Sequence, residues 1–140
     1  MQPAYIPWIG YYDRISQSDL FIYLDDVQLD HSSKTRFTNR NKINSSSGPH
    51  WLTLPLMQKG NTHKPIMELE LLQDRWKIKH KKNIQFNYKN SPFYNEFKKN
   101  IIESFDKDWF LLVDLIFYLD NLFFDILKIN TPVIRSSEIN

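Results

Sequence analysis

One segment limits the fold more than any other. The stretch Trp109 to Leu127, WFLLVDLIFYLDNLFFDIL, predicts a helix that is apolar on nearly every side. Such a helix must be enclosed, either by the rest of the chain or by lipid. Asp114, Asp120 and Asp125 interrupt it, and three bare carboxylates in hydrocarbon would be costly. The segment therefore predicts a buried helix inside a folded domain and no membrane span.

The composition predicts a single domain over residues 1–140. The length is that of one ordinary domain, and 15% aromatic residues supply material for a core. The absence of cysteine excludes disulfides and thiolate chemistry and fits the cytoplasm. A net charge of +2 is far below that of a dedicated nucleic-acid binder. The four histidines lack the spacing of a zinc site, and the sequence contains no phosphate-binding or dinucleotide-binding glycine motif.

The order of the expected elements favours an α/β fold. Apolar runs and alternating patterns predict strands at residues 1–5, 19–28, 51–56, 65–71 and 131–137. Periodicity and start signals predict helices at residues 9–16, 76–88, 93–105 and 109–127. The polar segment 29–48 predicts mostly loop. This order is typical of a mostly parallel sheet with flanking helices, in which ligands bind beyond the carboxyl ends of the strands.

The first fifteen residues, MQPAYIPWIGYYDRI, form one candidate site. Gly10 allows a ligand to approach the backbone, and the start of the helix offers N–H groups to an anion. The alternative is structural, with Pro3 and Pro7 shaping a turn while the aromatic rings pack. The candidate substrate-binding residues here are Gln2, Tyr5, Gly10 and Tyr11.

Two carboxylates end the strand predicted at residues 19–28. Asp25 or Asp26 can act as a general base or as a Mg²⁺ ligand. Because neighbours in a strand point to opposite faces, at most one of them faces a pocket, and the substrate-binding candidate Gln28 returns to the side of Asp26. The alternative is a solvated strand end, or a carboxylate paired with arginine.

Basic residues supply two further candidates. Arg36, Asn39, Arg40 and Lys42 lie in a polar loop that suits phosphate or carboxylate groups, although such loops are more often only solvated. Asn39 and Arg40 are the substrate-binding candidates in this loop.

A second basic group surrounds His80. Lys77, Lys79, Lys81 and Lys82 predict either a solvated helix face or a surface that contacts tRNA or an anionic lipid carrier. His80 lies on the inner side of the same helix, either as a packed core residue or as a catalytic candidate.

The last candidate site lies at the end of the strand predicted at residues 131–137. Arg135 can hold an anion, with Ser136 and Ser137 as hydrogen-bond donors. The alternative is a frayed terminus or the N-cap of a further helix. Nothing in the spacing identifies the base and the orienting acid that a serine nucleophile needs.

Six blocks of the chain resemble the WbqC-like protein family, in the family's order: MQPAYIPWIGYYDRI, DLFIYLDDVQ, NRNKI, G-x-x-WLTLPL, RWKIKHKKNIQFNYKNSPFY and VIRSSEI. The resemblance runs over essentially the whole chain. Where the family usually has RNR, this chain has Asn39-Arg40-Asn41-Lys42, which keeps the charge but not the arginine fork. Family members continue well beyond the last block, so we expect this chain to lack the family's C-terminal part.

The resemblance implies a bacterial protein of O-antigen or other polysaccharide biosynthesis, as in lipopolysaccharide. The implied activity is amino-acyl transfer, with glycine as the expected acyl group, to the amino group of a nucleotide-linked or lipid-linked sugar. Aminoacyl-tRNA and an adenylate both stay open as donors. In this interpretation Asp25 or Asp26 accepts the proton of the amine, and Arg40 and Arg135 hold phosphates.

Two other functions stay open. The order strand, P-x-x-G turn, helix, strand is distantly similar to the nucleotidyltransferase superfamily, which implies ATP with Mg²⁺ as cofactor. The two histidines of that superfamily's turn are missing from the stretch Pro7 to Tyr11. The other possibility is a non-catalytic binding or scaffold protein of the polysaccharide machinery. The sequence makes no prediction of the oligomeric state.

Overall fold

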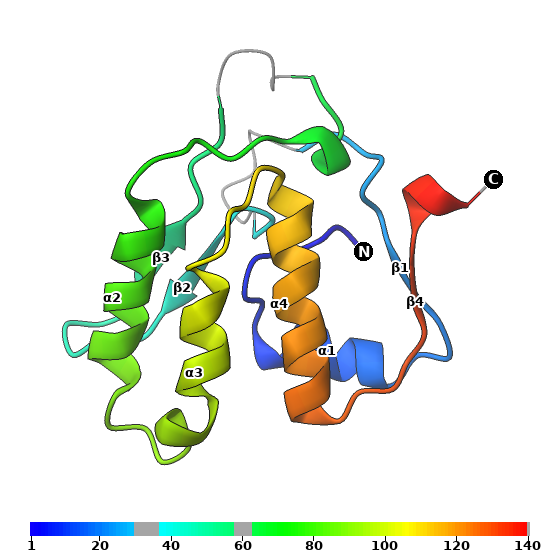
Figure 1. Cartoon of the computed structure of the whole chain (residues 1–140). Helices are drawn as coiled ribbons and strands as arrows, with labels where there is room; N and C mark the ends of the chain where they lie inside the picture. The colour runs from blue at the N-terminus through cyan, green and yellow to red at the C-terminus, as the bar shows by residue number, and fades with distance from the viewer. Residues whose placement is uncertain (30–36, 58–62, 140) are drawn as a thin grey trace.

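The computed structural model describes residues 1–29, 37–57 and 63–139, which form a mixed α/β structure (Figure 1). The described residues contain four α-helices: α1 (Ile9–Ser16), α2 (Trp76–Tyr88), α3 (Tyr94–Ser104) and α4 (Leu112–Leu127). They contain four strands: β1 (Phe21–Tyr23), β2 (Arg40–Ile43), β3 (His50–Thr53) and β4 (Val133–Arg135). The same residues also form two short 3₁₀ helices, η1 (Ile66–Glu68) and η2 (Ser136–Glu138).

Helix α4 is the central element, as the sequence predicted (Figure 1). Its buried side chains lie on several sides of the helix: Leu112, Val113, Leu115, Ile116, Leu119, Asp120 and Phe124. Asp114 and Asp125 are exposed, so the helix carries only one of its three carboxylates into the interior. Lys128 ends the helix in the left-handed conformation, with φ of 57°. No described helix combines the length and the apolar character needed to cross a membrane.

The other helix predictions are also confirmed. In α2 the positions that recur every four residues face inward, since Trp76, His80 and Ile84 are buried. Helices α1 and α3 lie within one residue of the predicted bounds. These helices could be predicted because their inward positions repeat at short range along the chain.

The strands β1, β3 and β4 lie in or overlap predicted strands at 19–28, 51–56 and 131–137, but their pairing differs from the expectation. The described strands form two separate two-stranded sheets instead of one mostly parallel sheet: β1 pairs with β4 in parallel, and β2 pairs with β3 antiparallel. The segment 1–5 is not a strand, although Met1 lies beside β1 and its carbonyl accepts from the Leu24 N–H at 2.8 Å. Pro3 and Pro7 have no N–H to donate, which prevents a longer ladder.

One strand lies in a segment that was expected to be mostly loop, and one predicted strand is wrong. The segment 29–48, expected to be mostly loop, contains β2. Alternate residues of this polar strand, Asn41 and Ile43, are buried. The segment 65–71, expected to be a strand, forms η1 and isolated bridges. Strand pairing depends on partners that are distant in the sequence, so a short polar strand has little local signature.

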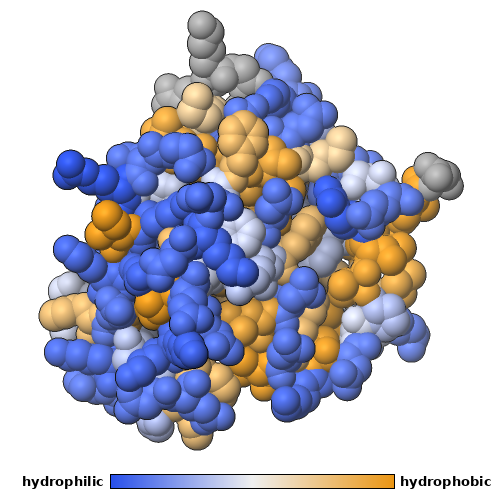
Figure 2. Space-filling view, viewed as in Figure 1, coloured by the Kyte–Doolittle hydropathy of each residue, from blue (hydrophilic) through white to orange (hydrophobic). Residues whose placement is uncertain are grey.

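Helix α4 lies between two apolar clusters. The larger draws residues from α2, β2, β3 and α4, and includes Ile43, Leu52, Ile84, Leu112, Leu115 and Ile116. The smaller surrounds α1 and β1 and includes Tyr11, Tyr12, Ile15, Phe21, Tyr23 and Phe124. Phe117 and Phe123 of α4 pack against both clusters. Figure 2 shows that some apolar surface stays exposed between α3 and α4 and along the β1–β4 pair.

Candidate functional site

A dense polar cluster lies at the carboxyl ends of β1 and β4. The parallel pairing of Tyr23 with Arg135 brings Asp25 beside the residues that follow β4. Arg135 Nε donates to Asp25 Oδ2 at 2.6 Å, and Ser137 Oγ donates to the same oxygen at 2.9 Å. The Ser137 N–H donates to Asp25 Oδ1 at 3.1 Å. The structure thus joins two of the predicted sites, as expected for strand ends at one edge of a sheet.

Ser136 connects the two adjacent carboxylates of this cluster. Its hydroxyl donates to Asp26 Oδ1 and accepts from the Asp25 N–H at 3.2 Å. Asp25 is fully buried, whereas Asp26 is exposed. Among the described residues, neither Ser136 nor Ser137 is hydrogen-bonded to a histidine, so the cluster lacks the arrangement of an activated serine.

Asp25 is held as an anion. Burial alone raises the pKa of this carboxyl, but the hydrogen bonds from Arg135 and Ser137 outweigh it and leave the pKa below its ordinary value. A general base at neutral pH needs a higher proton affinity than the Asp25 carboxyl has. The geometry therefore favours a positioning role for Asp25, which fixes the guanidinium of Arg135.

A second buried carboxylate, Asp120 of α4, has a different environment. The Tyr12 hydroxyl donates to its Oδ1 at 2.8 Å, and the Tyr23 hydroxyl donates to its Oδ2 at 2.7 Å. Burial raises the pKa of Asp120 to about 7, although both tyrosine hydrogen bonds act in the opposite direction. None of the described cations is hydrogen-bonded to Asp120, so the cost of burying its charge is not offset and the pKa stays raised.

Asp120 lines a cavity of about 190 Å³ next to the Asp25 cluster. The cavity lies between α4, the β1–β4 pair and η2, and its lining includes Tyr23, Phe117, Asp120, Phe124, Arg135 and Glu138. The Arg135 guanidinium lies 5.1 Å from the centre of the Phe117 ring, and its Nη1 lies 3.7 Å from Glu138 Oε1. The cavity therefore combines apolar walls, one carboxyl that titrates near neutrality and one arginine fixed by Asp25.

The N-terminal segment approaches the same carboxyl. Tyr11 is buried, and its hydroxyl donates to the Gln2 carbonyl at 3.1 Å. Burial raises the pKa of Tyr11, and the charge of Asp120 adds to that effect. A Cβ at Gly10 would lie 2.8 Å from Nε1 of the exposed Trp8 side chain, which would have to shift.

Tyr5 and His80 form a separate buried pair in the larger cluster. His80 Nε2 donates to the Thr53 carbonyl at 3.1 Å, which leaves Nδ1 to accept from the Tyr5 hydroxyl at 2.7 Å. Burial lowers the pKa of His80 to about 4, and the charge of Lys79 acts in the same direction. Both ring nitrogens are satisfied by protein groups, so the arrangement favours the core role. The catalytic role of His80 stays a prediction.

The other predicted binding residues lie apart from this cavity. The Arg40 guanidinium lies 4.5 Å from the Trp51 ring centre, and Asn39 Nδ2 donates to the Leu54 carbonyl at 2.9 Å. Gln28 Nε2 donates to the His63 carbonyl at 3.0 Å. Arg36 lies outside the described residues. Neither Asn39 nor Arg40 lines the Asp120 cavity.

The lysines around His80 match a solvated helix face. Lys77 pairs with Asp108 at 3.0 Å, and Lys81 pairs with Asp106 at 2.5 Å. Lys79 is exposed. Asp106 and Asp108, which follow α3, thus form ion pairs with two of the four lysines.

Of the two carboxylates predicted as Mg²⁺ ligands, the buried Asp25 is not available to an ion. Among the described residues, no group of three or more His, Asp or Glu side chains is placed to hold a metal ion. Asp25, the buried candidate ligand, is occupied by Arg135 and Ser137. Mg²⁺ sites need oxygen ligands that are available to the ion.

Sequence reasoning did not single out Asp120 as a site residue. A signal was present, because Asp120 lies four residues after Ile116 and four before Phe124, on one side of the predicted helix. That side is buried, whereas the sides of Asp114 and Asp125 are exposed. Recognising that this carboxylate is enclosed also requires α1 and β1, whose tyrosines donate to it.

The chain belongs to the WbqC-like protein family, whose model matches residues 2–140. It is similar to a protein of Mycobacterium tuberculosis (strain ATCC 25618 / H37Rv) that is described as uncharacterized protein Rv1507c. The two are 38% identical over 96 residues, which cover 69% of this chain and 40% of that relative. This chain thus matches less than half the length of that relative. No solved structure matches the chain.

Proposed function

We propose that the protein transfers an amino-acyl group, with glycine as the expected acyl group, to the amino group of a sugar, and that Asp120 is the general base. One observation carries the proposal: a buried carboxyl with a pKa of about 7 lines a cavity that also contains an arginine. Strongly shifted carboxyls in cavities are candidates for acid–base catalysis.

The reaction requires such a group. The amine of the acceptor attacks the acyl carbonyl, the C–N bond forms, and the bond to the donor's leaving oxygen breaks. The attacking nitrogen must lose one proton, which passes to an Asp120 oxygen. A base with a pKa near the operating pH is best suited to this step, because it is both available and strong enough.

Arg135 supports an anionic substrate. Its Nε is committed to Asp25, whereas its terminal nitrogens contact only the exposed Glu138, at 3.7 Å, among the described residues. A phosphate of a nucleotide-linked or lipid-linked amino sugar can replace this weak contact with charge-assisted hydrogen bonds. The resemblance to the WbqC-like family implies polysaccharide biosynthesis in the bacterial cytoplasm as the setting. Aminoacyl-tRNA and an adenylate both stay open as the donor.

The test is a transfer assay with matched variants of one helix. The chain is incubated with glycyl-tRNA or glycyl-adenylate and a nucleotide-linked amino sugar, and mass spectrometry measures the glycylated sugar. We expect Asp120→Asn to lower kcat by about 10²–10⁴-fold, because the amide cannot accept the proton. Asp114→Asn, an exposed carboxylate of α4, should leave the rate unchanged.

Two results would overturn the proposal. If Asp120→Asn transfers glycine at the unaltered rate, Asp120 is not the base. If the folded chain binds the amino sugar but yields no product with either donor, the protein is a binding or scaffold protein. Release of pyrophosphate from ATP without acyl transfer would instead support the nucleotidyl-transfer alternative.

A further inference from the structure

A second and larger pocket lies on the other side of α4. Its volume is about 340 Å³, within the range of roughly 300–1,000 Å³ typical of ligand pockets. The lining is almost entirely apolar and includes Ile84, Tyr88, Phe93, Phe97, Ile101 and Phe123, from α2, α3, α4 and the α2–α3 connection. A pocket of this kind suits a hydrocarbon ligand better than a sugar or a nucleotide.

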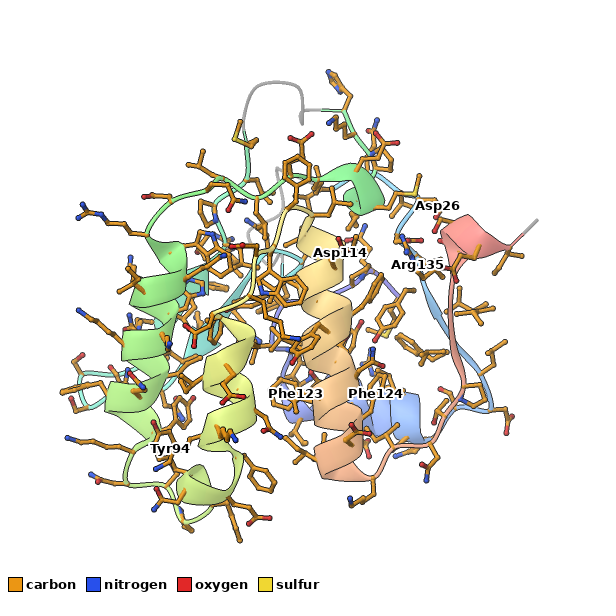
Figure 3. The ribbon with its side chains drawn as sticks, in the orientation of Figure 1. Asp26, Tyr94, Asp114, Phe123, Phe124 and Arg135 are labelled. Atoms are coloured by element: carbon orange, nitrogen blue, oxygen red, sulfur yellow. The ribbon has the colours of Figure 1, made fainter. Side chains whose placement is uncertain are left out.

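The two pockets are distinct. Phe123 lines the apolar pocket, and the next residue, Phe124, lines the Asp120 cavity. Figure 3 shows Phe123 on the side of α4 that faces α3 and Phe124 on the side that faces β1 and β4. The apolar pocket is therefore not part of the proposed catalytic site.

One cation lies at the edge of the apolar pocket. Lys98 of α3 is the only charged residue in its described lining. Lys98 Nζ donates to Asn95 Oδ1 at 2.9 Å and lies 5.8 Å from the centre of the Tyr94 ring. No described carboxylate forms an ion pair with it. An exposed ammonium beside an apolar pocket complements an apolar chain that ends in an anion.

The backbone beside the pocket is strained. Ile6 lines the pocket with φ of 43°, a left-handed conformation that is unfavourable for a β-branched residue. The Asn41 side chain donates to the Ile6 carbonyl and holds this conformation. Such strained residues cluster at ligand sites, where the surrounding structure compensates for the cost.

We propose that this pocket binds the hydrocarbon chain of a lipid phosphate, with Lys98 at the phosphate. The apolar lining selects the hydrocarbon chain of the ligand. The Lys98 ammonium, which forms no ion pair with a described carboxylate, selects the anionic head group. The proposal goes beyond amino-acyl transfer, and it is tested by binding alone, so either proposal can fail without the other.

The first experiment measures the affinity of the intact chain for soluble probes by calorimetry. Octyl phosphate and decyl phosphate, each kept below the concentration at which it forms micelles, are compared with decanol and with inorganic phosphate. Decyl phosphate has two more methylenes than octyl phosphate and should bind about 15-fold more tightly if the alkyl chain enters the pocket. Decanol should bind more weakly than decyl phosphate, and inorganic phosphate should not bind. Absence of decyl phosphate binding, or equal affinity for decanol, overturns the proposal.

The second experiment places the ligand with paired variants. Lys98→Gln should weaken decyl phosphate binding by about fivefold and leave decanol binding unchanged, whereas Lys99→Gln, the exposed neighbour on the same helix, should change neither. Phe93→Ala should weaken binding of both probes, whereas Phe86→Ala should not. Phe93 and Phe86 are 67% and 65% exposed, so both variants should fold, and only Phe93 lines the pocket.

Methyl NMR provides the site-specific readout. Decyl phosphate should shift the methyl signals of Ile84 and Ile101, which line the pocket, and not that of Ile15, a residue of α1 that is buried in the smaller cluster. Shifts confined to other isoleucines would overturn the assignment. Sedimentation of the ligand-free protein tests whether a second copy of the protein fills the pocket instead. A dimer that buries Phe93 and that decyl phosphate does not dissociate would mean that it does.

Discussion

Asp25 and Asp120 are both buried carboxylates, yet the pKa of Asp25 is lowered and that of Asp120 is raised. Asp25 accepts hydrogen bonds from a guanidinium and from a backbone N–H, which favour the charged form. Among the described residues, Asp120 accepts only from the hydroxyls of Tyr12 and Tyr23, which do not overcome the cost of burying a charge. The first carboxyl suits positioning, and the second suits proton transfer.

The adjacent aspartates allow a direct comparison of stability. Asp25→Ala should lower the free energy of unfolding by about 3 kcal/mol, because it leaves Arg135 and the Ser137 N–H without their partner. Asp26→Ala should lower it by less than about 1 kcal/mol, because Asp26 is exposed. Urea denaturation at neutral pH measures both, and equal losses would contradict the assigned role of Asp25.

At the scale of elements, the helices and the positions of β1, β3 and β4 could be predicted from the sequence, whereas β2 and the strand pairing could not. Positions such as Trp76, His80 and Ile84 repeat within one helix, so their pattern is local. β2 is polar and four residues long, and its existence depends on β3. The meeting of Asp25 with Arg135 followed from a general property of parallel strands, whereas the enclosure of Asp120 depends on tyrosines of α1 and β1 that no local pattern places.

The central position of α4 predicts a contrast between two leucines of the same helix. Leu115→Ala should lower the free energy of unfolding by about 2–5 kcal/mol, because Leu115 is fully buried and its truncation leaves a cavity. Leu127→Ala should cost less than about 1 kcal/mol, since Leu127 is 39% exposed at the end of the helix. Chemical denaturation checks the pair, and similar losses would contradict the interior position of α4.

For the whole molecule, two buried groups make opposite contributions to the pH dependence of stability. The pKa of His80 is lowered from 6.5 to about 4, so its contribution is present above pH 6.5 and is lost as the pH falls to about 4. The pKa of Asp120 is raised from 3.8 to about 7, so its contribution is present below pH 3.8 and is lost as the pH rises through 7. Each contribution amounts to about 3–4 kcal/mol.

We therefore expect the free energy of unfolding to change little between pH 4.5 and 7 in the natural sequence, because the two slopes nearly cancel. In Asp120→Asn only the contribution of His80 remains, so the free energy of unfolding should fall by about 3 kcal/mol as the pH is lowered through this range. Asp114→Asn should keep the flat profile. Urea denaturation at several pH values measures the three curves, and a flat curve for Asp120→Asn would contradict the opposed contributions.

The pairing of β1 with β4 also has a consequence for the order of events during synthesis. Asp25 and Arg135 are separated by 110 positions, an interval of roughly 6–22 s at about 5–20 residues per second on the ribosome. Throughout that interval Asp25 lacks its guanidinium and must stay hydrated, so β1 cannot settle into the interior. Helices α2 and α3 are neighbours in the sequence and can pack together without this delay. The Asp120 cavity is completed only after β4 has been synthesised.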